Sequence, residues 1–151
     1  MISPRQRFGL ALALTVATLI SSPARAGLAI QNWTTPGGTR VFFVESRALP
    51  IVDVQVDFRA AGAEAPAGKA GIAGLTRALM ESGAGSLDED AIANRVADLG
   101  AQIGGGADMD RASLSLRTLS SPVERDGAVD LLATLIRQPV FPAAAVEREK
   151  A

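Results

Sequence analysis

The spacing of apolar residues divides the chain into strand-like and helix-like segments. In residues 51–59 apolar and polar side chains alternate, which predicts a strand with one buried and one solvated face. Two earlier apolar stretches, 28–34 and 39–46, flank a Pro-Gly-Gly sequence and predict a hairpin. Residues 101–107 and 111–119 predict a second antiparallel pair, because two strand-like stretches again flank a turn.

Four other segments are predicted to be α-helices. The first begins at Gly71, has apolar residues at i, i+3 and i+7, and ends in residues 82–85. Capping-box sequences, Ser-x-x-Glu, predict that the second helix begins at Ser86 and the third at Ser121. The second helix is expected to end at Gly100 and the third at Gln138, and the fourth begins at Pro142.

The predicted order of elements is β-β-β-α-α-β-β-α-α. Strands in antiparallel pairs and helices in pairs indicate an α+β fold, an antiparallel sheet with its helices packed on one face. The third helix is expected to bury Val129, Leu132 and Ile136. Because the last helix ends before it shows an apolar face, we expect the chain to be a fragment, truncated at its C-terminal end.

The first 26 residues have the pattern of a secretory signal peptide. Arg5 and Arg7 precede an apolar run over 8–20, and the small-x-small sequence of 24–26 follows it. An N-terminal membrane anchor is the alternative, but a spanning helix needs about 20 apolar residues. We therefore expect cleavage near Ala26, a periplasmic or secreted protein, and a single domain over residues 27–151.

Composition excludes several classes of function. The 151 residues contain no histidine and no cysteine, so a Ser–His–Asp triad, a thiol nucleophile, a disulfide and the usual zinc, copper or haem sites are absent. After removal of residues 1–26 the chain would carry 12 basic and 16 acidic residues, a net charge of −4. No basic stripe then remains for nucleic acid or an anionic membrane.

The remaining candidates for chemistry each have a structural explanation that we favour. Acidic residues 88–90 resemble metal ligands but fit the first turn of a helix, and the two aspartates of 108–110 fit a hairpin turn. The glycines of 104–106 lack the spacing of a phosphate-binding loop and predict a bulge or a close backbone approach within a strand. Arg77 and Glu81 are spaced for a helical ion pair rather than a catalytic dyad.

Two consecutive strings resemble the N-terminal domain of the insulinase/pitrilysin zinc peptidases, which include the mitochondrial and bacterial processing peptidases. They are Ala-Gly-Ala-Glu at 61–64 and Gly-Ile-Ala-Gly-Leu-Thr-Arg-Ala-Leu-Met-Glu-Ser-Gly at 71–83. In that family a strand ending in Ala-Gly-Ser-x-x-Glu leads to Gly-x-Ala-His-x-x-Glu-His, the inverted zinc motif. The resemblance continues through 97–101 and 139–149 and covers residues 28–151.

The chain departs from this motif at each chemically active position. Gly74 and Ala78 stand where the family has its two zinc-binding histidines, and Arg77 stands where it has the glutamate that activates water. Glycine and alanine have no ligand atoms, and arginine cannot accept a proton. The resemblance thus implies the fold but no enzyme activity, no metal and no cofactor in this chain, with zinc expected only in a catalytic partner. It assigns no substrate-binding residue.

Three hypotheses for function follow. The first is a non-catalytic, insulinase-like subunit that helps bind an extended peptide beside an active His-x-x-Glu-His partner, as a heterodimer in periplasmic proteolysis. The second is a periplasmic peptide-binding or scaffolding module with no link to proteolysis. A hydrolase using a divalent cation at Asp108 and Asp110 is the least favoured, because no general base lies near these residues in the sequence.

Overall fold

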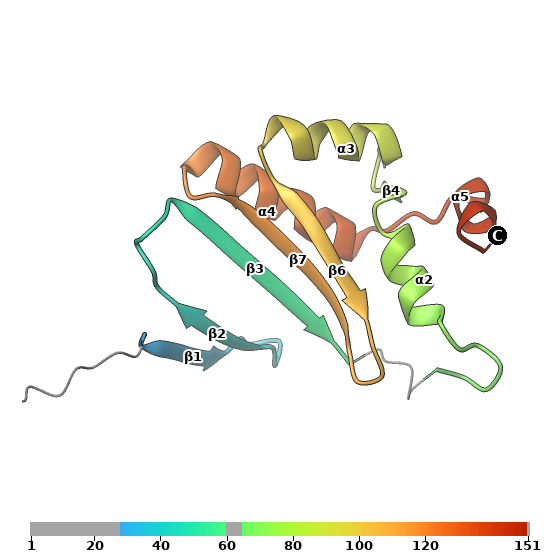
Figure 1. The fold of residues 1–151 in the computed structure, drawn as a ribbon, viewed down its shortest axis with the longest axis horizontal. Coiled ribbons are helices and arrows are strands. Elements are labelled where there is room, and N and C mark those ends of the chain that lie inside the picture. The colour runs from blue at the N-terminus through green and yellow to red at the C-terminus, as the bar shows by residue number, and fades with distance from the viewer. Residues whose placement is uncertain (1–27, 60–64, 151) are drawn as a thin grey trace, which may run out of the picture. The chain divides into compact units, whose positions relative to one another are not determined.

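The computed structural model describes residues 28–59 and 65–150, which fall into two units divided between Arg47 and Ala48 (Figure 1). Each unit is described by itself. The predicted signal peptide lies outside the described residues. Among the helices of the described ranges, none combines the length and the apolar character needed to cross a membrane.

The first unit contains the predicted N-terminal hairpin. Strand β1 (Ile30–Thr34) pairs with β2 (Arg40–Val44) in antiparallel register, with Thr34 opposite Arg40. The Thr35 side chain stabilises the turn, since its Oγ1 accepts a hydrogen bond from the Thr39 amide at 3.1 Å. Gly38 in this turn has φ 85°, a conformation that glycine adopts without strain.

An antiparallel sheet forms the centre of the second unit. Its strands are β3 (Ile51–Phe58), β6 (Gln102–Ala107) and β7 (Ala112–Leu119), in the order β3-β7-β6. Each coincides closely with a segment predicted from the sequence. Because the apolar residues of neighbouring strands fall opposite one another, as Val54 and Leu116 do, the sheet has one apolar face.

The opposite face of this sheet is polar and carries a bidentate ion pair. Arg117 donates from Nε and Nη2 to the two carboxylate oxygens of Asp53, at 2.7 and 3.0 Å. The two residues are direct cross-strand neighbours, which is the arrangement in which opposite charges stabilise a sheet. The hydrogen bond from Arg117 lowers the pKa of Asp53 below its ordinary value.

The depressed pKa of Asp53 predicts how the ion pair contributes to stability at different pH. A carboxyl whose pKa is lower in the folded state stabilises the protein above its unfolded pKa, and this contribution is lost as pH falls through the folded pKa. Arg117→Gln should therefore lower stability slightly at pH 7 and by nothing measurable near about pH 2. Urea denaturation at both pH values tests this, and an equal loss at both would contradict it. High salt should diminish the effect at pH 7.

The described residues form four helices, and a short hairpin that the sequence did not predict joins the first two of them. The expected β-β-β-α-α-β-β-α-α order is thus found with two further strands between its first two helices. The helices are α2 (Ile72–Leu79), α3 (Glu89–Asp98), α4 (Pro122–Arg137) and α5 (Ala143–Lys150), and the hairpin consists of β4 (Gly83–Ala84) and β5 (Leu87–Asp88).

The hairpin moves the start of α3 by two residues, so the predicted cap at Ser86 is wrong. Pairing with β4 keeps the chain extended through Asp88, which becomes the N-cap. Its Oδ1 accepts a hydrogen bond from the amide of Ala91 at 2.8 Å. Asp88 therefore satisfies one of the free amides of the first turn, the role expected of Ser86.

The third helix starts where the sequence predicts, although its capping box is not formed. Ser121 is the N-cap and Pro122 the first helical residue. The Ser121 hydroxyl, however, donates to the carboxylate of Glu124 at 2.5 Å and does not cap a backbone amide. This hydrogen bond lowers the pKa of Glu124.

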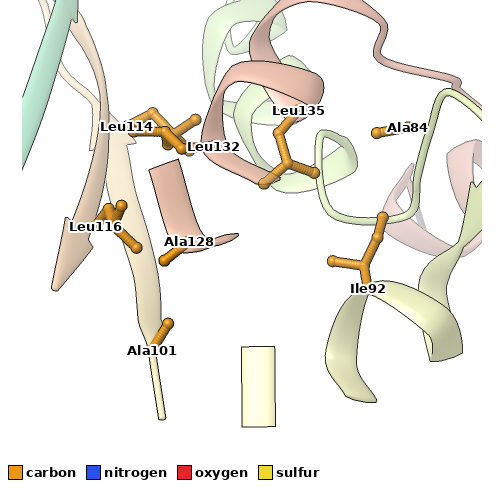
Figure 2. Packing of buried hydrophobic residues seen from close by; sticks show 8 residues of the cluster. All are labelled: Ala84, Ile92, Ala101, Leu114, Leu116, Ala128, Leu132 and Leu135. Carbon is orange, nitrogen blue, oxygen red and sulfur yellow. The ribbon is translucent and has the colours of Figure 1, made fainter. Parts of the chain in front are cut away.

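The hydrophobic core lies between the apolar face of the sheet and the helices (Figure 2). Leu132 is buried as predicted and Ile136 is half-buried, but Val129 is 41% exposed, so this part of the prediction is wrong. The buried stripe of α4 instead begins one residue earlier, at Ala128. The core cluster consists of Ala84, Ile92, Ala101, Leu114, Leu116, Ala128, Leu132 and Leu135.

Candidate functional site

Helix α2 carries the three positions that correspond to the zinc motif. Gly74 and Ala78 are one helical turn apart and both are exposed. A Cβ atom added to Gly74 would meet no other atom within 4 Å. Arg77 lies on the inner side of the helix, where only 11% of its side chain is exposed. The two positions that correspond to the family's histidines thus face solvent, whereas Arg77 faces the body of the unit.

Arg77 forms one ion pair and leaves another of its donors without an acceptor. Its Nη1 donates to Glu81 Oε1 at 2.9 Å, which confirms the helical pair predicted from the spacing. Its Nε is buried and has no hydrogen-bond partner. A buried donor without a hydrogen-bond partner costs about 1–3 kcal/mol, so the unpaired Nε of Arg77 is energetically unfavourable.

A glycine of β6 makes room for this guanidinium. A Cβ atom at Gly105 would lie 3.0 Å from Arg77 Nε and would collide with the backbone carbonyl of Ser113 on β7. Gly105 also has φ 130°, which side-chain-bearing residues rarely adopt. The close backbone approach predicted from the glycines of 104–106 is confirmed at this position.

A cavity of about 520 Å³ lies beside the inner side of α2. Its wall is mainly apolar and includes Arg77, while no aspartate or glutamate among the described residues lines it. No local pattern in the sequence predicts this cavity, because its walls come from several separate parts of the chain. The apolar lining side chains include Phe58, Ile72, Met80, Leu114, Ile136 and Phe141.

The residues at the motif positions do not fit zinc. Gly74 and Ala78 offer no donor atom, and the positive charge of Arg77 would repel a cation. In the parts of the chain that the structure describes, no three carboxylate, histidine or cysteine side chains come together as a possible metal site. The donor set at α2 therefore has none of the chemistry that zinc requires.

The acidic run at 88–90 serves the start of a helix, as we favoured from the sequence. Asp88 caps α3, and Glu89 and Asp90 occupy its first turn. Negative charge at this end of a helix is stabilised by the positive end of the helix dipole. Glu89 also accepts hydrogen bonds from Arg148 Nη2, with 3.0 Å to each carboxylate oxygen. This exposed pair connects α3 with α5.

The aspartates at 108 and 110 belong to the turn between β6 and β7. Asp108 Oδ1 accepts hydrogen bonds from the amides of Asp110 and Arg111, at 2.8 and 2.9 Å. The hydrogen bond from the Asp110 amide, and to a smaller extent that from the Arg111 amide, lowers the pKa of Asp108. A carboxylate held in this way is a turn former and a poor general base, which supports the structural explanation over the hydrolase hypothesis.

Histidines restored at the two exposed positions should bind zinc. We expect the variant Gly74→His/Arg77→Glu/Ala78→His to give saturable, chelator-reversible Zn²⁺ binding in calorimetry, because histidines at i and i+4 share one helical face. The matched control, Gly74→His/Arg77→Glu/Thr76→His, also introduces two histidines and one glutamate. Its histidines stand at i and i+2, on different sides of the helix, so it should bind Zn²⁺ more weakly. Equal binding by the two variants would contradict the assignment of the motif positions.

Comparison with solved structures finds the same fold in two bacterial proteins. The crystal structure of the peptidase M16 inactive domain from Pseudomonas fluorescens matches with a TM-score of 0.76 and 40% sequence identity, over 82% of this chain and 30% of that chain. A protease from Helicobacter pylori matches with a TM-score of 0.70 and 16% identity, over 82% of this chain and 29% of that chain. The second likeness shows the fold alone.

The chain spans less than a third of the length of either of these proteins. No protein-family model matches the sequence, and no curated protein matches it. The α+β fold predicted from the order of strands and helices is confirmed by the structure and by these neighbours.

Proposed function

Because this chain belongs to the insulinase (M16) family and has Gly74, Arg77 and Ala78 at the zinc-motif positions, we propose that it is a peptide-binding subunit beside a catalytic partner. The chain itself is a non-catalytic homologue, 40% identical to a domain described as inactive. In this proposal the partner carries His-x-x-Glu-His and its zinc, and this chain carries no cofactor.

The observation that carries the proposal is the state of helix α2. The helix and the sheet beneath it are intact, whereas the two histidine positions and the glutamate position of the zinc motif carry Gly74, Ala78 and Arg77. A domain that keeps this fold without its chemistry fits a role in holding substrate. The two exposed positions, Gly74 and Ala78, carry neither a charged nor a metal-ligating side chain.

Strand β6 offers a way to hold an extended peptide. Within the described part of the second unit, β6 is an edge strand, paired with β7 on one side only. Half of the backbone groups of an edge strand point away from the sheet and can pair with an added strand. The three glycines at 104–106 present no side chains that would obstruct such a peptide.

We place the protein in the periplasm on the strength of its N-terminal sequence. The basic start, the apolar run and the small-x-small sequence at 24–26 favour export and cleavage near Ala26. The intact mass of the exported chain tests this, because cleavage removes residues 1–26 as one piece. An exported chain of full length would contradict it.

A pull-down tests the proposed role. The tagged chain is recovered from a periplasmic extract and assayed for peptide cleavage with and without a zinc chelator. We expect chelator-sensitive cleavage only when a second, His-x-x-Glu-His-bearing protein is recovered with the bait. Cleavage by the purified chain alone would refute the non-catalytic assignment. Peptide binding without any catalytic partner would instead favour a binding or scaffolding module unconnected with proteolysis.

A further inference from the structure

We propose that the cavity beside α2 binds the C-terminal residue of a peptide, with its apolar side chain in the cavity and its free carboxylate on Arg77. This inference rests on the proposed peptide-binding role and names the end of the peptide that the chain recognises.

The size and lining of the cavity suit an apolar group. Its volume of about 520 Å³ lies within the range of about 300–1,000 Å³ that is typical of ligand pockets. Ile72 and Phe141 in its lining are 42% and 44% exposed, so part of its apolar wall faces solvent. Burial of this wall by an apolar side chain would release water from both surfaces and stabilise the complex.

The charge of the lining selects an anion. Arg59 and Arg77 line the cavity, and no acidic residue of the described chain does. The Arg77 guanidinium is mostly buried, and its partner Glu81 is 37% exposed. A charge with so little access to water is stabilised by a second, nearby negative group.

The geometry of Arg77 leaves one edge of its guanidinium for a carboxylate. Arginine binds a carboxylate through two parallel donors, and Arg117 uses Nε and Nη2 for Asp53 on the same sheet. In Arg77 the ion pair with Glu81 uses Nη1, and Nε has no partner. The backbone of β6 comes close to that Nε at Gly105, where a Cβ atom would lie 3.0 Å from it, and Arg77 itself lines the cavity.

A peptide C-terminus combines the two features that the cavity requires. Its carboxylate is attached to the same carbon as the side chain, so an apolar last residue presents an apolar body directly beside a negative charge. An internal aspartate or glutamate provides the charge without the apolar body. We therefore expect peptides that end in leucine or phenylalanine with a free carboxylate.

Fluorescence anisotropy with the full chain tests this. Two N-terminally labelled peptides of one sequence end in leucine, one as the free acid and one as the amide. We expect the free acid to bind at least about tenfold more tightly, because the amide lacks the charge that pairs with Arg77. Equal affinities would overturn the inference and leave the peptide-binding role intact, whereas binding of neither peptide would overturn both.

A third ligand distinguishes the peptide from a small molecule. Octanoate also joins an apolar body to a carboxylate, but it lacks a peptide backbone. We expect it to compete only at concentrations well above those of the free-acid peptide. Octanoate that displaces the labelled peptide at equal concentration would overturn the assignment to a peptide C-terminus.

Two substitutions in the cavity and one control outside it locate the site. Arg77→Gln should abolish the preference for the free acid, while Arg117→Gln, the same change on the polar face of the sheet, should retain it. Thr76→Phe should narrow the cavity, which Thr76 lines, and weaken free-acid binding without removing Arg77. Because Thr76 is exposed, we expect Thr76→Phe to fold normally. It therefore tests the site even if Arg77→Gln fails to fold. Unchanged free-acid affinity in correctly folded Thr76→Phe would overturn the proposal.

Discussion

Replacing Gly105 with alanine is expected to lower the free energy of unfolding by about 3 kcal/mol. Two effects combine, because the residue has φ 130° and because its new Cβ atom would collide with the carbonyl of Ser113. That carbonyl is backbone in the central strand β7 and cannot move without disturbing the sheet. Urea denaturation followed by far-UV circular dichroism measures the loss.

The neighbouring Gly106 provides the matched control. It lies in the same strand, but its φ is outside the positive range and an added Cβ would meet nothing within 4 Å. Gly106→Ala should therefore change stability by less than about 1 kcal/mol. Similar losses in the two variants would show that alanine disfavours β6 in general and that the close approach at Gly105 is not the cause.

Leu135→Ala is expected to destabilise the protein by about 2–5 kcal/mol. Leu135 is fully buried in the core cluster, on the side of α4 that faces Ala84 and Ile92 (Figure 2). Truncation removes apolar atoms from a packed interior and leaves a cavity that the rigid helix and sheet fill only in part. Thermal and urea unfolding of the variant would give the magnitude.

Val129→Ala is the comparison for this truncation. Both residues lie on α4, but Val129 is 41% exposed, so its truncation should cost less than about 1 kcal/mol. The pair of variants also tests which side of α4 is buried, the point on which the periodicity of the sequence was misleading. A larger loss for Val129→Ala than for Leu135→Ala would contradict the packing described above.

The strands were predictable because the sheet buries only one face. Alternation in β3 and β7 follows directly from that burial, and the observed register places Val54 opposite Leu116 on the apolar side. On α4 the prediction was less accurate, because the stripe of apolar residues is wide. Val129 fits a helical period as well as Ala128 does, and only packing against β7 decides between them.

The hairpin of β4 and β5 could not be predicted, since backbone hydrogen bonds hold it and no side-chain pattern accompanies it. The amide of Val140 donates to Gly83, and the amide of Gly85 donates to Gln138, each at 2.8 Å. These bonds join residues more than 50 positions apart in the sequence. Such pairing leaves no trace in local periodicity.

The candidate site was predictable in part. Spacing alone identified the Arg77–Glu81 pair, and the glycines of 104–106 indicated a close approach. The burial of Arg77 and the cavity beside it depend on how α2, the sheet and the segment after α4 come together. The positions of the lost zinc motif came from the resemblance to a family and not from the residues themselves.

The exposure of Gly74 and Ala78 has a consequence for how this domain diverges during evolution. Substitutions at exposed helical positions usually change stability by no more than about 0.5 kcal/mol, so purifying selection for a stable fold exerts little pressure there. The inner side of the same helix, with Leu79 buried, is constrained by packing. Replacement of zinc ligands at these two positions is therefore compatible with an intact fold, whereas Leu79 on the same helix is held in place by packing.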